Sequence, residues 1–192
     1  MKKVVKFGAP LAVIALAIAL AVFKPWLLFV DKEVNDEIPN FTAQTAPATT
    51  TAQSEPGTSE TPGTATTEAN ETPTTPVLIA QGDFISHEHE TTGRALVFKL
   101  PNGSHQLALE NLATSNGPDV NVWFSQGPVV EGVAGWTTAN DHPHLSLGAI
   151  KGNVGNQVYD LPADFNPSDW PTVDLWCEQF GVSFGAAALQ AV

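Results

Sequence analysis

Apolar and polar positions divide the chain into three regions with different patterns. Residues 7–30 are almost continuously apolar, residues 40–76 are polar without periodicity, and residues 77–192 carry short runs in which apolar and polar residues alternate. A long apolar run is typical of a membrane-spanning helix, whereas alternation is typical of β-strands that bury one face. The pattern therefore predicts a transmembrane helix over 7–30, a disordered linker over 40–76 and a β-rich domain over 77–192.

The charges that flank the apolar run predict its orientation. Residues 1–6 contain three lysines, residues 7–23 contain no charge, and acidic residues crowd the segment 31–37. Since basic residues stay on the cytoplasmic side, residues 1–6 are predicted to be cytoplasmic, and the domain is predicted to lie outside the cell membrane on a single anchor. A cleaved signal peptide is the alternative, because Ala19-Leu20-Ala21 fits a cleavage site, but the apolar stretch continues beyond it, which favours the anchor.

The composition of the polar region predicts a tether. Residues 40–76 consist mainly of Thr, Ala, Pro, Ser, Glu and Gly, with Phe41 as their one aromatic residue. This composition cannot bury enough apolar surface to offset the entropy of ordering the chain. As a flexible coil the region would span roughly 35 Å on average, so we expect it to set the height of the domain above the membrane.

The clearest local signal in the domain is a β-hairpin over 94–110. Asn102-Gly103 separates two alternating runs, and this dipeptide favours a two-residue loop because both residues accept positive φ. A two-residue loop sets the following pairs of residues opposite one another: Leu100 with His105, Phe98 with Leu107, and Leu96 with Leu109. This register is predicted to place the large apolar side chains of both strands on one face.

Further strands are predicted where short apolar runs lie between turn signals. They cover residues 83–86, 119–125, 145–150, 157–161 and 172–184. No window shows helical periodicity, so the fold class is predicted as all-β, an antiparallel β-sandwich or barrel of short strands. Within 172–184 the apolar side of the strand changes near Glu178-Gln179, which predicts a β-bulge at that point.

Charge and cysteine content narrow the partners and the chemistry. Residues 77–192 contain three basic residues against twelve acidic ones, which repels phosphate backbones, so nucleic acid is not an expected partner. Cys177 is the one cysteine of the chain. No disulfide can therefore form within the chain, and the domain must be held together by apolar burial.

Several motifs of the domain occur in the order in which a known family carries them. They are Gly82-Asp83-Phe84, the segment 89–95, Asn116-Gly117-Pro118-Asp119, Leu147-Gly148 with Lys151-Gly152-Asn153, and Trp176-Cys177 followed by Phe184-Gly185. Together they resemble the DM13 domain over nearly all of residues 77–192. The resemblance implies an extracytoplasmic β-domain, in some proteins joined to haem-binding DOMON modules, with a near-invariant cysteine for which an electron-transfer role has been proposed. Cys177 occupies that position here.

Three interpretations of Cys177 are open. It is a buried structural thiol, a ligand of a metal or haem, or a thiol that forms a mixed or intermolecular disulfide. In each case a lone cysteine cannot cycle as a dithiol within the chain. Electron transfer through Cys177 would therefore require a bound cofactor or a redox partner, and the sequence identifies neither.

A metal site would need further ligands, and the domain contains five histidines. His87 and His89, like His142 and His144, are spaced so that both imidazoles of a pair would lie on one side of a strand. Only His89 falls in a stretch that matches the DM13 motifs, so His89 joins Cys177 as a candidate cofactor ligand. We interpret His142 and His144 as solvated loop residues.

One further motif concerns hydrolases. Residues 181–185 fit the G-x-S-x-G pattern of the α/β-hydrolase nucleophile elbow, in which an acid and a histidine follow the serine along the chain. No acid or histidine follows Ser183, so a hydrolase is not expected. Two functions from different classes remain: a redox or electron-transfer module centred on Cys177, or a non-catalytic binding or structural module on the cell surface.

Overall fold

A computed structural model describes residue 13 and residues 30–43 and 74–192 of the chain. The predicted transmembrane helix over 7–30 and the cytoplasmic residues 1–6 lie almost entirely outside these ranges. Within the described residues, no helix combines the length and the apolar character that crossing a membrane requires.

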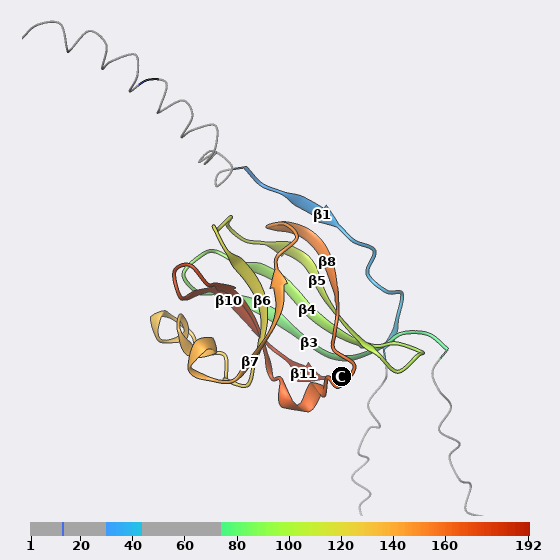
Figure 1. Cartoon of the computed structure of the whole chain (residues 1–192). Coiled ribbons are helices and arrows are strands. Elements are labelled where there is room, and N and C mark those ends of the chain that lie inside the picture. Colours follow the sequence, from blue (N-terminus) through green and yellow to red (C-terminus); the bar gives the residue numbers. More distant parts are fainter. Residues whose placement is uncertain (1–12, 14–29, 44–73) are drawn as a thin grey trace, which may run out of the picture.

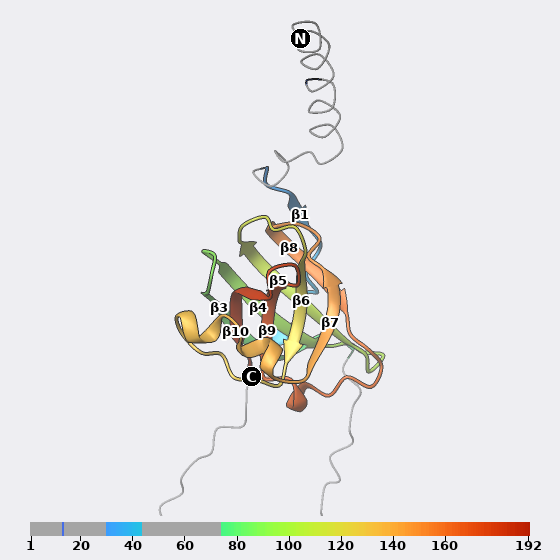
Figure 2. The same cartoon turned by 60° about the vertical axis from the view of Figure 1, so that its left-hand side comes forward.

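The described part of the chain is all-β, as predicted, and forms one strongly curled sheet (Figures 1 and 2). The strands follow the order β1-β8-β5-β4-β3-β10-β9-β6-β7, while β2 and β11 pair with β3 outside this path. Pairing is antiparallel except between β1 and β8 and between β2 and β3. The sheet resembles half of a barrel, so the prediction of a sandwich or barrel is confirmed for the fold class and not for a closed or two-sheet architecture.

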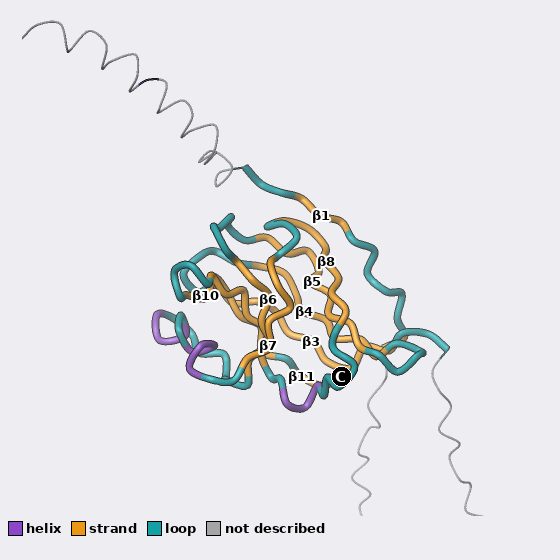
Figure 3. Tube along the Cα trace, viewed as in Figure 1, coloured by secondary structure: helices purple, strands orange, loops and turns teal. Residues whose placement is uncertain are grey.

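The strands have the following bounds: β1 Glu33–Asn35, β2 Thr42–Ala43, β3 Val77–Ser86, β4 Thr92–Lys99, β5 His105–Ala113, β6 Val120–Ser125, β7 His144–Ala149, β8 Val154–Asp160, β9 Thr172–Cys177, β10 Val182–Ala188 and β11 Gln190–Ala191. Three short 3-10 helices lie in the connections: η2 Val133–Gly135, η3 Thr138–Asp141 and η4 Pro167–Asp169. Figure 3 shows how little helix these connections add to the described residues.

The main core lies on the concave side of the curled sheet. Alternate residues of β6 and β9 contribute to it, and Phe84 of β3 and Phe184 of β10 are among its aromatic side chains. Yet β6 and β9 are buried at every position, because a second layer of chain covers their other face. Polar residues on that second face are therefore also withdrawn from solvent.

The hairpin over 94–110 exists, but its predicted register is wrong by one residue. Phe98 lies opposite Gln106, and Leu96 lies opposite Ala108. The closing residue of a two-residue loop must donate its N–H, which Pro101 lacks. Leu100 N donates to Ser104 O instead, at 2.8 Å. The loop thus has three residues and ends with Gly103 at φ 86°, as in a type I turn followed by a bulge.

This register places apolar side chains of the hairpin on both faces of the sheet. Val97 and Leu107 belong to the main core, whereas Leu96 and Phe98 belong to a second cluster on the convex side. The expectation of a single apolar face is therefore wrong. The convex cluster is covered by Ile38 and by Phe41, whose ring centroid lies 5.1 Å from that of Phe98.

Residues 31–43 form an ordered arm that runs along the sheet (Figure 1). β1 pairs with the start of β8, and β2 pairs with the start of β3. Gly152 and Gly155 permit this close approach, because a Cβ on either would lie 2.2 Å or less from a carbonyl oxygen of the arm. The rest of the predicted linker, residues 44–73, lies outside the described residues.

The run over 172–184 is two strands and not one bulged strand. β9 ends at Cys177, residues 178–181 turn, and β10 returns antiparallel with Val182 opposite Cys177. Gly181 has φ 64° and its N–H donates to Cys177 O, which closes the turn. The change of apolar side near Glu178-Gln179 therefore marks a reversal of the chain, and the bulge predicted there is wrong.

Candidate functional site

Cys177 is the last residue of β9 and is fully buried, at 0% exposure, in the main core. Val120 of β6 and Val182 of β10 flank it in register. The turn that follows is exposed, and Phe180 within that turn is 67% exposed. The thiol is thus enclosed by apolar side chains, one exposed turn away from solvent.

His89 lies in the connection between β3 and β4. Its ring packs against Phe184, with ring centroids 3.9 Å apart, and its Nε2 lies 2.6 Å from a Glu88 carboxylate oxygen. Phe184 belongs to the same core cluster as Cys177. His89 thus packs on the rim of the core cluster that contains Cys177, and no direct contact joins the two residues. Among the described residues no group of three or more His, Cys, Asp or Glu suited to a metal ion is found.

His105, His142 and His144 lie at three different positions in the fold. His142 follows η3, and its Nδ1 lies 3.0 Å from Thr138 O. His144 is the first residue of β7, exposed, and its ring lies flat on Trp123 with centroids 3.7 Å apart. His105 is half-buried beside Phe165, and burial lowers its pKa.

The ring of His144 begins an aromatic stack that runs into the sheet. Trp123 of β6 lies between His144 and Trp176 of β9, with the two indole centroids 5.0 Å apart and their planes inclined by 21°. Both indoles are almost fully buried, on the face of the sheet opposite to Cys177. The stack therefore connects an exposed imidazole with the residue that precedes Cys177 in the chain.

The second layer over this face is the segment 126–143, which contains η2 and η3. Backbone oxygens of this segment accept hydrogen bonds from Thr172 Oγ1 and Ser125 Oγ at the sheet surface. Ser183 N also donates to Trp136 O, at 2.8 Å. The segment closes off a space in which polar side chains of β9 and β10 meet away from water.

A chain of three polar side chains crosses that space. Ser183 Oγ donates to Asp174 Oδ2 at 2.8 Å and lies 2.7 Å from His87 Nδ1. His87 Nε2 in turn lies 3.1 Å from Val130 O in the covering segment. Asp174 and Ser183 are 1% and 0% exposed. Strands β9 and β10, the β3–β4 connection and the covering segment are thus connected through one hydrogen-bonded path.

Burial shifts the pKa values at both ends of this path toward the neutral forms. Withdrawal of Asp174 from solvent raises its pKa to about 7, against the opposing effect of the hydrogen bond from Ser183. Burial also lowers the pKa of His87, against the effect of its hydrogen bond to Val130 O. Both shifts favour a proton on the carboxyl group and a neutral imidazole.

Asp174 Oδ1 and Trp123 Nε1 are buried polar atoms without a hydrogen-bond partner among the described residues. Trp123 lies opposite Asp174 in the β6–β9 register, so their side chains project from the same face of the sheet. One atom is an acceptor and the other a donor. Such atoms are rare in folded proteins and call for an explanation.

Ser183 meets an acid and a histidine, yet the arrangement is not a catalytic triad. In a triad the histidine lies between the serine and the acid, so that it can take the serine proton. Here Ser183 lies in the middle, inside a strand and at 0% exposure. The rejection of a nucleophile elbow at Ser183 therefore stands.

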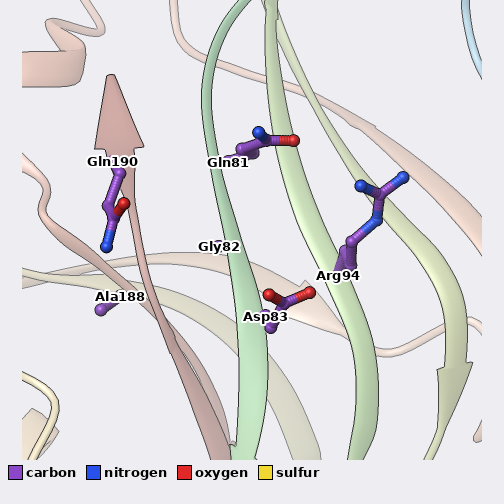
Figure 4. A pocket seen from close by; sticks show the side chains of 6 residues that line it. All are labelled: Gln81, Gly82, Asp83, Arg94, Ala188 and Gln190. Atoms are coloured by element: carbon purple, nitrogen blue, oxygen red, sulfur yellow. The ribbon is translucent and has the colours of Figure 1, made fainter. Parts of the chain in front are cut away.

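A shallow polar pocket of about 330 Å³ lies elsewhere on the surface, across β3. Figure 4 shows Gln81 and Asp83 on β3, with Arg94 on the strand to one side and Gln190 on the strand to the other. Arg94 is already paired with Glu110. Neither Cys177 nor His89 lines this pocket, so it does not contribute to the site around β9.

Asp174, Ser183 and Trp123 were missed by reasoning from the sequence. A signal existed for Asp174, since it is the one charged residue within Val173–Trp176, a run that the apolar pattern places in the core. Ser183 was considered only as part of a hydrolase motif. Nothing in the sequence indicates that His87 reaches Ser183 across 96 residues.

Comparison with known proteins agrees with the resemblance found in the motifs. A family model described as "Electron transfer DM13" matches residues 83–189, which is more than half of the chain and includes Cys177 and the Asp174–Ser183–His87 path. No curated protein and no solved structure matches the chain.

Proposed function

This chain belongs to the DM13 family, and from that premise we propose that it is an electron-transfer domain held at the outer face of the cell membrane, with Cys177 as a redox-responsive residue. Residues 7–30 supply the proposed membrane anchor and place residues 1–6 in the cytoplasm. The domain exchanges electrons with a partner protein or a bound cofactor, because one thiol cannot complete a dithiol cycle alone.

The observation that carries the proposal is the aromatic stack that ends at Trp176, the residue before Cys177 in β9, on the opposite face of the sheet. His144, Trp123 and Trp176 lead from the surface to the strand that ends in Cys177. Stacked aromatic rings in contact provide short steps for an electron between a surface partner and a buried group. A structural core alone would not need an exposed imidazole lying parallel on a buried indole.

The burial of Cys177 restricts the chemistry that it could perform. A thiol at 0% exposure is closed to a bulky disulfide partner while β9 and β10 stay paired. Exchange with a partner thiol would require opening of the turn over 178–181, whereas one-electron exchange would not. We therefore favour one-electron exchange over formation of a mixed disulfide.

Voltammetry of residues 31–192, with soluble one-electron mediators whose potentials are too low to oxidise an indole, tests this function. The wild-type domain should show a reversible signal that Cys177→Ser abolishes, while His105→Gln, which changes a half-buried histidine at the start of β5, should leave it intact. Near-UV circular dichroism confirms that both variants are folded. A wild-type domain that exchanges no electrons, or a signal that survives Cys177→Ser, would refute the role of Cys177.

A non-catalytic binding module is the second candidate, and exposed apolar residues favour it. Val133 and Phe180 are 72% and 67% exposed, and a partner that covered both side chains would remove apolar surface from water. Val133 lies in the covering segment, and Phe180 lies in the turn after Cys177. In this case Cys177 would serve only to fill the core, and the voltammetry above would give no signal.

A further inference from the structure

We infer that Trp123 is a redox-active residue whose indole proton is taken up by the buried Asp174–Ser183–His87 path when the ring loses an electron. The inference deepens the proposed electron-transfer function and rests on it, because it names the group that carries the electron and the groups that manage its proton. Two unpartnered buried atoms and three hydrogen bonds support it.

The donor and the acceptor face the same buried space. Trp123 Nε1 and Asp174 Oδ1 each lack a partner among the described residues, and their residues lie opposite one another on β6 and β9. A buried indole N–H without an acceptor is unfavourable in a purely structural core. The residue opposite carries an unpartnered carboxyl oxygen on the same face of the sheet, and this oxygen is the acceptor that we assign to the indole proton.

The hydrogen bonds of His87 determine how a proton can travel. Val130 O can only accept, so His87 Nε2 carries hydrogen. In the neutral imidazole, Nδ1 then accepts from Ser183 Oγ. Ser183 Oγ donates to Asp174 Oδ2 while the carboxyl group is ionised; when Asp174 carries its proton on Oδ2, the direction of this hydrogen bond reverses and Ser183 Oγ accepts. Every bond of the path is satisfied in this arrangement, and the raised pKa of Asp174 and the lowered pKa of His87 favour it.

Loss of an electron from Trp123 to a one-electron oxidant starts the proposed step. Nε1 and Oδ1 are not hydrogen-bonded at rest, so the step begins with a side-chain movement that brings the two atoms into hydrogen-bond contact. The Nε1–H bond then breaks and its proton goes to Asp174 Oδ1. The proton on Asp174 Oδ2 passes to Ser183 Oγ, and the hydroxyl proton of Ser183 passes to His87 Nδ1. The products are a neutral indolyl radical, a neutral carboxylic acid, a neutral serine and an imidazolium ion, so one electron leaves and no proton is lost.

The location of the new charge explains why the path has three members. The positive charge left by the electron appears on His87, which is half-buried and whose Nε2–H remains bonded to Val130 O. Asp174 and Ser183, which are almost fully buried, stay neutral before and after the step. A direct transfer that left a charge inside the sheet would cost far more free energy.

Photochemical oxidation of the full chain in detergent micelles tests the inference. A photo-oxidised ruthenium polypyridyl complex serves as the one-electron oxidant, and transient absorption distinguishes the indole radical cation from the neutral radical. The background carries Phe at Trp26, Trp136 and Trp170, so that only the two stacked indoles remain. We expect a neutral radical that is lost in Trp123→Phe and retained in Trp176→Phe.

The proton path is tested by variants that keep Trp123. Asp174→Asn should lengthen the lifetime of the radical cation at least tenfold, and so should His87→Gln, which leaves both strand residues in place if the Asn variant fails to fold. The inference is overturned if Trp123→Phe retains the radical, or if the cation decays at the wild-type rate in His87→Gln.

A further variant separates this inference from the proposed function. Cys177→Ser should leave the Trp123 radical and its deprotonation unchanged. A normal radical together with a voltammetric signal that is independent of Cys177 would refute the role of Cys177 alone. Loss of the proton-coupled behaviour with a Cys177-dependent signal intact would refute only the role of Trp123.

Discussion

Ser183 and Asp174 are joined by a hydrogen bond of 2.8 Å inside the β-sheet, where neither side chain is more than 1% exposed. The two residues lie on adjacent strands, and the bond is one part of a path that continues to His87. Because water does not reach this bond, each partner depends on the other for the hydrogen bond it would otherwise make to solvent.

Removal of the Ser183 hydroxyl should therefore destabilise the fold. Ser183→Ala leaves the Asp174 carboxyl group without its remaining partner, and an unsatisfied buried polar group costs about 1–3 kcal/mol. Urea unfolding of residues 31–192 measures the loss. Ser146→Ala removes a hydroxyl from an exposed position on β7 and should change the free energy of unfolding by less than about 0.5 kcal/mol; equal losses in both variants would contradict the prediction.

The stability of the domain should depend on pH through Asp174. Its pKa is raised from 3.8 to about 7 by burial, so the folded state keeps a proton that the unfolded state has released. The stabilisation from this group is complete below about pH 3.8 and is lost as the pH rises through about 7.

Asp174→Asn should abolish this loss. The comparison is made in a His87→Gln background, which removes the opposing titration of His87. There the Asp174→Asn variant should gain unfolding free energy relative to the chain that keeps Asp174 between pH 4 and pH 7, by an amount on the order of 4 kcal/mol at most. Unfolding in urea across this pH range gives the difference. A constant difference would mean that Asp174 titrates normally.

The reactivity of Cys177 should follow the stability of the turn after β9. Gly181 has φ 64° and nothing lies within 4 Å of a Cβ built on it, so Gly181→Ala strains the backbone without a clash, at a cost of about 1 kcal/mol. The buried thiol should then react with a maleimide about fivefold faster.

Gly103→Ala is a matched control for the turn. Gly103 also has positive φ and open space around it, but it lies in the β4–β5 hairpin and not beside Cys177. Equal acceleration of labelling in both variants would show that the thiol is reached by global unfolding and not by local opening of the β9–β10 turn.

The ordered arm over 31–43 should contribute to stability through its contact with Gly152. A Cβ at this position would lie 2.2 Å from Lys32 O, so Gly152→Ala should displace β1 and weaken the ion pair between Lys151 and Asp36. We expect a loss of about 1–2 kcal/mol in residues 31–192 by urea unfolding. The same substitution in residues 77–192, which lack the arm, should cost much less.

Local patterns predicted the existence of strands better than their pairing. Alternation identified β6 and β7, and the Asn102-Gly103 signal found the β4–β5 hairpin, because these features depend on near neighbours. The register failed since Pro101 lacks the N–H that a two-residue loop requires. One missing donor was enough to move every side chain of the hairpin to a different partner.

The candidate site was predicted in part for a similar reason. Cys177 and His89 were identified by family resemblance, and burial of the thiol agrees with one of the interpretations that the sequence left open. The Asp174–Ser183–His87 path could not be predicted, because it depends on strand order and on the segment 126–143 lying over the sheet. Contacts between residues 96 positions apart leave no periodic trace in the sequence.

The pairing of the arm over 31–43 with the sheet also limits what a change in the length of residues 44–73 would do. β1 begins at Glu33, three residues after residue 30, so an anchor that ended at residue 30, as proposed above, would be followed by roughly 10 Å of chain before the sheet. Residues 44–73 leave the sheet at β2 and rejoin it at β3, which pairs with β2. Insertions there would enlarge a side loop and leave the length of chain between residue 30 and β1 unchanged.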